Sequence, residues 1–275
     1  MKNKIRKLLN FFLRFGIMLR LKQYIENQSY LKIDILNIKI IFFCPNALSK
    51  WRVQTIYIKE PETLEWIDNF KSDKKSIFWD IGANIGLYSI YASIRHKNLE
   101  IISFEPSSSN LRILSRNISI NNLENKVKIF QIPLSKTENH FSMMKEPSFI
   151  EGGAMNAYGA NFDFEGKKFI STMNYSIFGT NINSILDQKI LKVPNYIKID
   201  VDGIEHLILE GANKYLNHSE IHGILIEINE NFNSQKDAVM KIMKENNFRM
   251  VWKKNNNNFI KNPILKYTYN YYFSR

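Results

Sequence analysis

Short apolar runs alternate with segments of helical periodicity along most of the chain. Residues 76–81 (SIFWDI) have the character of a buried strand, and residues 86–95 repeat apolar positions at helical spacing. Further strands are expected at residues 101–104, 127–134, 196–201, 223–229, 248–252 and 267–273, and further helices after Ser107–Ser109 and at 204–216 and 237–246. Strands that alternate with helices form a mainly parallel sheet covered on both faces. The pattern therefore predicts an α/β, doubly wound, Rossmann-like fold.

Two segments lie outside this alternation. Residues 31–58 are rich in isoleucine and phenylalanine and predict a small β-rich extension, which is followed by a helix at 61–70 that begins with proline. Residues 136–186 contain several glycines and show no clear period, so we expect an irregular insert. The predicted organisation is an N-terminal helix and small β-rich subdomain at 1–75, and an α/β domain at 76–275.

The first 25 residues combine apolar and basic positions. Six apolar residues recur at helical spacing and predict an amphipathic helix: Ile5, Leu8, Leu9, Phe12, Phe15 and Leu19. Asn10 and Arg14 interrupt the apolar stretch, so it falls short of the ~20 apolar residues of a spanning helix, and no small-residue cleavage site of a signal peptide follows. The helix either docks on the domain or lies on an anionic membrane surface through residues 1–22.

The formal net charge of +12 raises the question of nucleic-acid binding, and the answer depends on where the charge lies. Residues 1–22 carry seven basic and no acidic residues, and residues 236–275 carry nine basic and two acidic residues. The remainder, 23–235, has a net charge of −2, so an extended phosphate-binding cleft there is not expected. The single cysteine, Cys44, excludes an internal disulfide and fits a reducing, cytoplasmic setting, in which the first helix could contact the inner face of a membrane.

A glycine-containing loop follows the strand at 76–81. The loop reads DIGANIG from Asp80 to Gly86, and Gly82 allows a sharp turn while Gly86 lets backbone pass close to a ligand. The dinucleotide fingerprint G-x-G-x-x-G is absent, because the middle glycine that admits a pyrophosphate is missing. The loop therefore favours a ligand without phosphate groups.

Glu105 ends the next strand, 25 positions after Asp80. An acid at this place can accept hydrogen bonds from both hydroxyls of a ribose, or it can pair with a lysine or cap the following helix. A glycine loop and a strand-end acid on successive strands together predict a nucleoside site.

Three stretches of sequence resemble the FkbM family of methyltransferases, a branch of the class I S-adenosylmethionine-dependent enzymes. They are FWDIGANIGLYS (78–89), SFEPSSSNLRILSRN (103–117) and YIKIDVDGIEHLILEGA (196–212). The resemblance implies an enzyme that uses S-adenosylmethionine to O-methylate a sugar or another small hydroxylated acceptor. It implies that the cofactor is bound by Asp80, Gly82, Ala83, Asn84, Gly86, Glu105, Pro106 and, in the segment IPLSKTE where related enzymes contact the adenine, Ser135. The family more often has Glu at the position of Asp202, and residues 1–75 lie outside the resemblance.

The catalytic candidates lie at the ends of the fourth and fifth strands of the alternation. These strands are neighbours in this architecture, so Asp200 and Asp202 are expected opposite Glu227 and Asn229. Asp200, Asp202 or Glu227 could take part in removing the hydroxyl proton. Alternatively, Asp200, Glu227 and Asn229 could hold a Mg²⁺-like ion, or Asp200 could simply pair with Lys198. We expect the insert at 136–186 and the N-terminal extension to wall the acceptor pocket.

Three other functions remain open at this stage. An NAD-dependent oxidoreductase is disfavoured by the missing glycine of the loop. A nucleic-acid methyltransferase is disfavoured by the Asp-Val-Asp-Gly sequence after the fourth strand and by the charge of the central segment. A non-catalytic scaffold docked on a membrane through residues 1–22 would bind without turnover.

Overall fold

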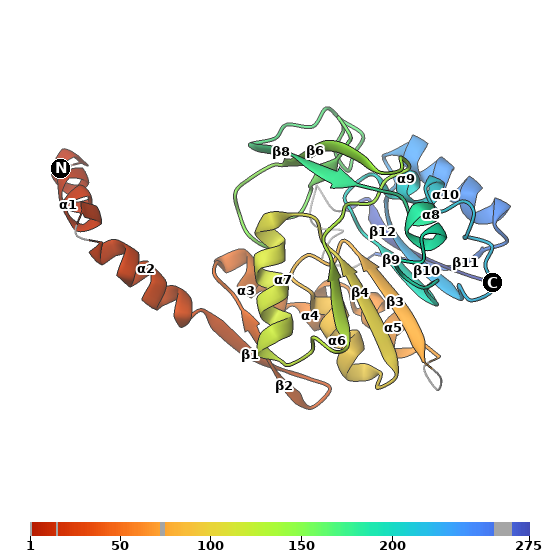
Figure 1. Ribbon diagram of the computed structural model, residues 1–275, viewed down its shortest axis with the longest axis horizontal. Helices are drawn as coiled ribbons and strands as arrows, with labels where there is room; N and C mark the ends of the chain where they lie inside the picture. The colour runs from red at the N-terminus through yellow and green to blue at the C-terminus, as the bar shows by residue number, and fades with distance from the viewer. Residues whose placement is uncertain (1, 15, 72–74, 256–265) are drawn as a thin grey trace.

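A seven-stranded sheet forms the centre of the computed structural model, which describes residues 2–14, 16–71, 75–255 and 266–275 (Figure 1). Across the sheet the strands are β11 (Arg249–Lys254), β12 (Thr268–Ser274), β10 (Gly223–Asn229), β9 (Tyr196–Ile199), β3 (Ser76–Ile81), β4 (Leu99–Phe104) and β5 (Val127–Phe130). The strands from β10 to β5 are parallel, and β12 is antiparallel to both β10 and β11. The predicted mainly parallel α/β sheet is confirmed. The chain reverses its direction across the sheet between β3 and β9, and ligands bind at such switch points, beyond the carboxyl ends of the strands.

Alternate side chains of the strands enter two hydrophobic cores, one on each face of the sheet. On β3, Trp79 and Ile81 enter one core and Phe78 enters the other. The first core is covered by α8 (Ile182–Asp187), α9 (Glu205–Glu210) and α10 (Asn233–Glu245), and the second by α5 (Pro61–Asp68), α6 (Leu87–Arg95) and α7 (Ser108–Ile120). Because both faces are buried, the parallel strands are apolar almost throughout.

Several element boundaries follow from identifiable residues. Ser107 caps α7 by accepting the Asn110 N–H, as the sequence predicts, and Pro61 begins α5. The strand expected at 127–134 ends at Phe130, shortly before Pro133, which has no N–H to donate to a sheet. The helix expected at 204–216 ends at Glu210.

The insert at 136–186 is more regular than its glycines suggest. It forms a three-stranded antiparallel sheet from β6 (His140–Glu146), β7 (Ala157–Tyr158) and β8 (Met173–Gly179), so the expectation of an irregular segment is wrong for this part. In Figure 1 this small sheet lies beside the start of α7, above the main sheet. The insert thereby lies next to the strand ends at which a ligand is expected.

The N-terminal part of the chain combines a hairpin with short helices. The hairpin pairs β1 (Tyr30–Ile35) with β2 (Ile38–Phe43), and α3 (Ala47–Gln54) and α4 (Ile56–Lys59) follow. The strand expected around Ile56 and Ile58 is therefore wrong, because these residues form α4. Hairpin and helices share the second core with the sheet, and the division of the chain at residue 75 stays a prediction.

Two helices, α1 (Lys2–Arg14) and α2 (Ile17–Asn27), replace the single N-terminal helix that the spacing predicts. Gly16 separates them with a left-handed φ of 68°, and Phe15 lies outside the described residues. None of the described residues in either helix is buried, and the pair projects from the body as an arm (Figure 1). Glu26 at the end of α2 pairs with Arg112 and Arg116 of α7, and the docking of the whole segment on the domain stays a prediction. Among the described residues, no helix has the length and apolar character to cross a membrane.

Candidate active site

The loop between β3 and α6 passes close to the end of β9. Gly82 has a φ of 88°, and a Cβ at this position would lie 1.8 Å from the Asp200 carbonyl oxygen. Gly86 also has a φ of 88°, and its Cβ would meet the Leu114 side chain at 2.6 Å. Only glycine fits Gly82 without a shift of backbone, so this turn fixes the distance between the two strand ends.

Glu105 lies just beyond the end of β4 and faces this loop. Its carboxylate accepts the N–H of Asn84 at 2.8 Å and the N–H of Ser107 at 2.9 Å. Burial raises the pKa of Glu105 to about 8, against the lowering effect of these hydrogen bonds. The predicted strand-end acid is thus a buried carboxyl group held at a defined place. Because its pKa is raised, it can lose a proton when a ligand binds that favours the ionised form.

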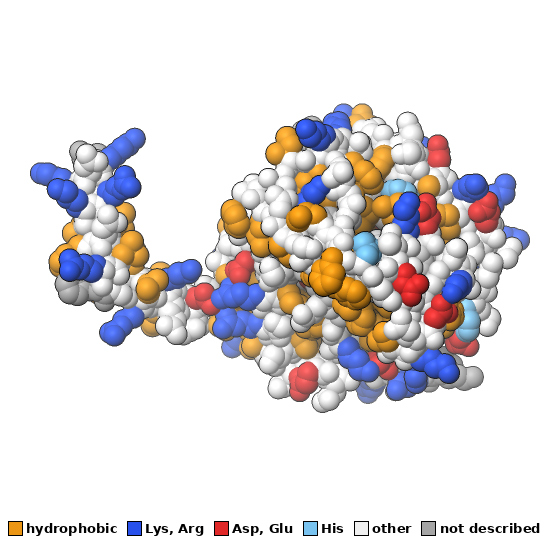
Figure 2. Space-filling view, turned by 45° about the horizontal axis from the view of Figure 1, so that its top comes forward, with side chains coloured by type: hydrophobic (Ala, Val, Ile, Leu, Met, Phe, Trp, Pro, Cys, Tyr) orange, Lys and Arg blue, Asp and Glu red, His pale blue; other side chains and the backbone are white. Residues whose placement is uncertain are grey.

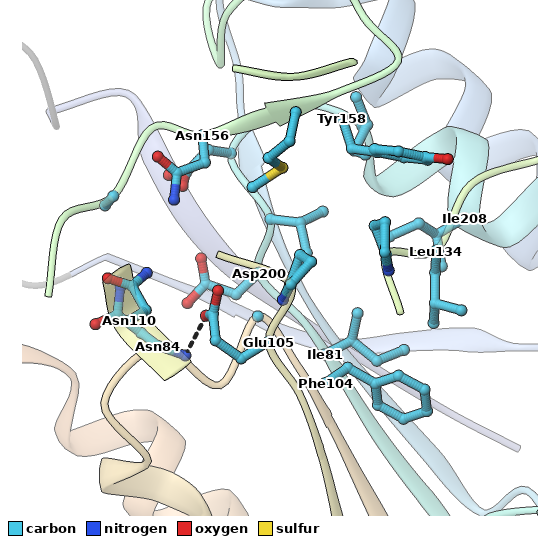
Figure 3. A pocket seen from close by; sticks show the side chains of 18 of the residues that line it. Ile81, Asn84, Phe104, Glu105, Asn110, Leu134, Asn156, Tyr158, Asp200 and Ile208 are labelled. Carbon is cyan, nitrogen blue, oxygen red and sulfur yellow. Dashed lines mark hydrogen bonds between the residues drawn. The ribbon is translucent and has the colours of Figure 1, made fainter. Parts of the chain in front are cut away.

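A cleft lies over Glu105 and is called the Glu105 cleft below. Figure 3 shows that its polar side chains gather at one end and its apolar side chains at the other. The polar end includes Asn84, Glu105, Asn110, Asn156 and Asp200, and the apolar end includes Ile81, Phe104, Leu134 and Ile208. This arrangement can hold a ligand that has hydroxyl or amino groups at one end and a flat, weakly polar ring at the other.

Some of the other predicted cofactor residues line the cleft, and others do not. Gly82 and Pro106 line the Glu105 cleft, and Ala83 lines a neighbouring cavity described below. Asp80 is fully buried beneath the loop, where it accepts a hydrogen bond from Ser89 at 2.6 Å; it does not line the cleft. Asp80 therefore supports the loop, and its buried position raises its pKa.

Ser135 does not line the Glu105 cleft, and its contact with the cofactor stays a prediction. Its hydroxyl accepts the N–H of Thr137 at 3.2 Å, and the cleft is lined at this place by the three preceding residues, Ile132, Pro133 and Leu134. The segment reaches the cleft as predicted, but its apolar residues face the ligand space. A weakly polar ring such as adenine would contact these side chains.

The carboxylates at the ends of β9 and β10 lie together as the sequence predicts. Ile199 pairs with Ile226, which places Asp200 beside Glu227 in the parallel register. Asp202 has a left-handed φ of 61°, and its carboxylate accepts the Met155 N–H at 2.6 Å. Asn229 is buried two positions beyond Glu227, and its side-chain oxygen accepts the N–H of Asn231.

A second cavity, called the Glu227 cavity below, adjoins the Glu105 cleft. Five residues line both spaces: Gly82, Asn84, Ala154, Asp200 and Asp202. The rest of the Glu227 cavity is lined mainly by aromatic and ionisable side chains, among them Trp51, Arg52, Lys59 and Tyr88. Two ligands could therefore occupy neighbouring sites on either side of Asp200 and Asp202.

The sequence did not reveal Glu60, which completes a group of three carboxylates. Oxygens of Glu60, Asp200 and Glu227 all lie within 4.8 Å of one another. Glu60 follows α4 in the N-terminal part of the chain, and its carboxylate accepts the Tyr88 hydroxyl at 2.7 Å. The sequence feature that could have pointed to Glu60 is its neighbour Pro61, because an acid directly before a helix that begins with proline occupies a fixed position.

Two lysines form ion pairs with this group of carboxylates and offset part of its negative charge. Lys198 is almost fully buried and donates to Asp200 at 2.5 Å, and Lys59 forms an ion pair with Glu60. Burial opposes the ionisation of Glu60, but the two lysines outweigh it and lower its pKa to about 2. The pairing of Asp200 with Lys198 that the sequence left open is thus observed.

Two carboxyl groups near these pairs have raised pKa values. Burial, with the charge of Asp200, raises the pKa of Asp202 to about 6. Burial also raises the pKa of Glu227 well above its usual value, and Asp200 and Glu60 add to the effect. Carboxyl groups with displaced pKa values in a cavity are candidates for proton transfer.

The predicted metal site does not fit these neighbours well. A Mg²⁺-like ion needs carboxylate oxygens that are free to coordinate it, whereas Glu60 and Asp200 each share an oxygen with an ammonium group. Lys59 and Lys198 supply the positive charge that such an ion would bring. The proposed reaction therefore needs no metal ion, and the metal site stays a prediction.

The loop Gly152–Asn156 of the insert separates the two spaces. The side chains of Asn84 and Asn110 donate to the Gly153 carbonyl at 2.6 Å and 3.1 Å, and Asp202 holds Met155. Arg52 donates to the Gly152 carbonyl at 2.7 Å. The insert therefore covers the Glu105 cleft as well as the Glu227 cavity, so its expected place on the acceptor side describes only part of its position.

Comparisons with known proteins support a single assignment. A family model described as the methyltransferase FkbM domain matches residues 80–250. A curated relative, methyltransferase sdnD of Sordaria araneosa, is 26% identical over 188 residues, which are 61% of this chain and 72% of that protein. The matched residues include the loop, Glu105 and the acids after β9, whereas Glu60 lies outside them.

Solved structures show a related fold. A protein of Streptococcus mutans assigned as an S-adenosylmethionine-dependent methyltransferase aligns with a TM-score of 0.51 and 8% identity, over 90% of this chain and 56% of that chain. The methyltransferase FkbM of Methylobacillus flagellatus KT aligns with a TM-score of 0.47 and 16% identity, over 72% of this chain and 43% of that chain. This chain thus spans less than half the length of the second protein.

Proposed function

Because the chain belongs to the FkbM methyltransferase family, we propose that it transfers a methyl group from S-adenosylmethionine to a hydroxyl of a sugar or another small hydroxylated acceptor. The observation that carries this proposal is the contact between two cavities. The Glu105 cleft and the Glu227 cavity share Asp200 and Asp202. Methyl transfer requires the cofactor and the acceptor to meet at one point, and two cavities with a common wall provide that point.

The Glu105 cleft fits the shape and polarity of S-adenosylmethionine. The Glu105 carboxylate can accept the two ribose hydroxyls, and the apolar side chains of Phe104 and Leu134 can contact the adenine. The turn at Gly82 lets the loop pass close to the Asp200 backbone, so Gly82 and Asp200 line the cleft together. When bound, the cofactor supplies an activated methyl group on a sulfonium sulfur.

The Glu227 cavity fits a polar acceptor. Arg52 and Lys59 can donate hydrogen bonds, Glu227 can exchange them with hydroxyl groups, and Trp51 offers an aromatic surface for the apolar face of a sugar ring. The cavity is lined by charges of both signs, which suits a polyhydroxylated molecule better than a uniformly charged one.

Asp202 is the proposed proton acceptor. The acceptor oxygen forms a bond to the methyl carbon while the carbon–sulfur bond breaks, and the hydroxyl proton passes to Asp202. Its pKa of about 6 leaves it ionised at neutral pH and still able to bind a proton. Lys198 pairs with Asp200 beside it, and Glu227, with its raised pKa, can donate a hydrogen bond to the acceptor.

The test is the release of S-adenosylhomocysteine from the purified protein in the presence of a panel of free sugars, nucleotide sugars and small polyols. Asp202→Asn keeps the shape of the side chain and is expected to lower turnover about 10²–10⁴-fold, with nearly unchanged cofactor affinity. Asp187→Asn, on the exposed end of α8, is the matched control and should retain full turnover. Unchanged turnover in Asp202→Asn would remove this residue from the mechanism.

The rival functions make different predictions for the same assay. An NAD-dependent oxidoreductase would bind NAD, and a scaffold would bind without turnover. The family match and the loop without a middle glycine favour the methyltransferase.

A further inference from the structure

The arm formed by α1 and α2 carries an apolar face that stays exposed. In α1, Ile5, Leu8 and Leu9 are each between 42% and 57% exposed, and their spacing places them on one side of the helix. In α2, Ile17 and Leu21 are each 48% exposed. An apolar stripe along two successive helices is unfavourable in water, so this surface is expected to be covered by a partner.

The positive charge of the arm excludes some of the partners that could cover its apolar face. Residues 1–22 carry seven lysines and arginines and no acidic residue. A second copy of the arm would be repelled by the same seven charges. The phosphates of a nucleic acid would match the charge but leave the apolar stripe uncovered. A lipid bilayer with anionic headgroups satisfies both requirements, because it offers phosphate groups and, directly beneath them, acyl chains.

We propose that the arm binds the surface of an anionic lipid bilayer and thereby holds the enzyme at a membrane. The apolar side chains of α1 and α2 enter the boundary between headgroups and acyl chains, and the basic side chains contact the headgroups. Figure 2 shows both kinds of side chain along the arm, which projects clear of the body.

Ion pairs fix the base of the arm to the body. Arg112 of α7 pairs with Glu26 at the end of α2 and with Glu151 of the insert, at 2.8 Å for the second pair. A groove beside this network is lined by Met18, Leu21 and Ile25 of α2 and by Phe149 and Ile150 of the insert. Phe149 is 70% exposed, so the apolar surface continues from the arm onto the insert that covers both cavities.

The test is sedimentation of the full chain with vesicles of phosphatidylcholine alone and of phosphatidylcholine mixed with phosphatidylglycerol. We expect binding to the mixed vesicles, weakened by salt, and little binding to the neutral ones. Leu8→Glu should weaken binding more than tenfold, and replacing Lys4, Lys7 and Arg14 by Gln should weaken it by about fivefold per residue. All four side chains belong to a helix without buried residues, so the variants should remain folded.

Val251→Glu is the matched control, because Val251 is 56% exposed on β11, at the opposite end of the molecule from α1 (Figure 1). It should bind the mixed vesicles like the wild type, and all variants should keep the thermal stabilisation by S-adenosylhomocysteine. Absence of binding to the mixed vesicles would overturn the proposal. So would a dimer in light scattering that Leu8→Glu dissociates, because the apolar face would then be covered by a second copy.

Discussion

Glu105 and Asp202 are buried carboxyl groups whose surroundings prepare them for different tasks. Glu105 accepts two backbone N–H groups and faces the Glu105 cleft, whereas Asp202 faces both cavities and holds the loop between them through Met155. Burial raises both pKa values, to about 8 for Glu105 and about 6 for Asp202. At neutral pH the two groups therefore differ in protonation, which is typical of residues that bind and residues that transfer protons.

Removing the Glu105 carboxylate should weaken cofactor binding. Glu105→Ala is expected to cost about 1–3 kcal/mol of binding free energy, because hydrogen bonds to an ionised acceptor are lost. Calorimetric titration with S-adenosylhomocysteine measures this loss. Glu100→Ala is the control on the same strand: Glu100 pairs with Lys128 away from the cleft and should bind like the wild type. Equal affinities in all three proteins would show that Glu105 does not hold the ribose.

The affinity for the cofactor should depend on pH through Glu105. Because the pKa of the free carboxyl group is about 8, the group is protonated at pH 6, whereas ribose hydroxyls favour the ionised form. Binding then releases a proton, so affinity should rise with pH by up to about tenfold per unit and level off above pH 8. The same titration of Glu105→Gln should lose this dependence. A pH dependence that persists in Glu105→Gln would assign it to another group.

Chelation should leave the enzyme active. Lys59 and Lys198 already compensate the carboxylates of Glu60 and Asp200, so turnover should be unchanged by EDTA and by added Mg²⁺. A loss of turnover on chelation that added Mg²⁺ restores would support the metal site predicted from the sequence.

Among the elements, the N-terminal hairpin and α7 are joined in part by one buried side chain of the helix. Asn117 is fully buried; its oxygen accepts the Phe43 N–H at 2.7 Å and its amide donates to the Ile85 carbonyl at 2.9 Å. It therefore joins β2 to the chain just before α6, close to the glycine loop.

Asn117→Ala leaves both backbone groups without this partner and should lower the free energy of unfolding by about 2–4 kcal/mol, as expected for two buried polar groups. Urea denaturation measures the effect. Ser115→Ala, on the exposed side of the same helix, should change stability by less than about 0.5 kcal/mol. A similarly small effect of Asn117→Ala would mean that other groups or water replace the hydrogen bonds.

The main elements could be predicted because their patterns are local. The strand ending at Ile81, the capped start at Ser107 and the acids after β9 follow directly from period, caps and strand ends. Ile56 and Ile58 could not be assigned in this way, because a four-residue helix contains too little of a period. The small sheet of the insert was hidden for a related reason, since its pairing is set by contacts across more than thirty residues, such as that of His140 with Gly179.

In the site, the sequence predicts the residues that lie at the carboxyl ends of the strands, because these ends meet at one edge of the sheet. Glu105 and Asp200 directly follow β4 and β9, and Glu227 lies near the end of β10, so topology alone places them at the same edge of the sheet. Glu60 comes from a segment whose packing on the sheet the sequence does not specify. The side chains of Asp80 and Ser135 do not line the cleft, because a motif fixes the position of the backbone while the direction of each side chain depends on its neighbours.

On the scale of the whole molecule, the structure combines a covered sheet, an insert over its strand ends and a basic arm. The net charge of +12 that first suggested nucleic acid is concentrated in the two ends of the chain, and the arm holds seven of its basic residues. The two cavities lie in the part of the chain whose charge is nearly balanced. We therefore expect that variants of the arm and variants of the cavities alter the proposed membrane binding and the proposed catalysis independently.

The central claim is that the Glu105 cleft binds S-adenosylmethionine, and a thermal-shift titration tests it most directly. The purified protein would be heated with S-adenosylmethionine, S-adenosylhomocysteine, NAD or NADP, each over a range of concentrations. We predict stabilisation by the two adenosyl compounds alone, by about 2.7 kcal/mol at a concentration ~100 times the dissociation constant, and a much smaller effect in Glu105→Ala. Stabilisation by NAD alone, or by none of the four, would contradict the account.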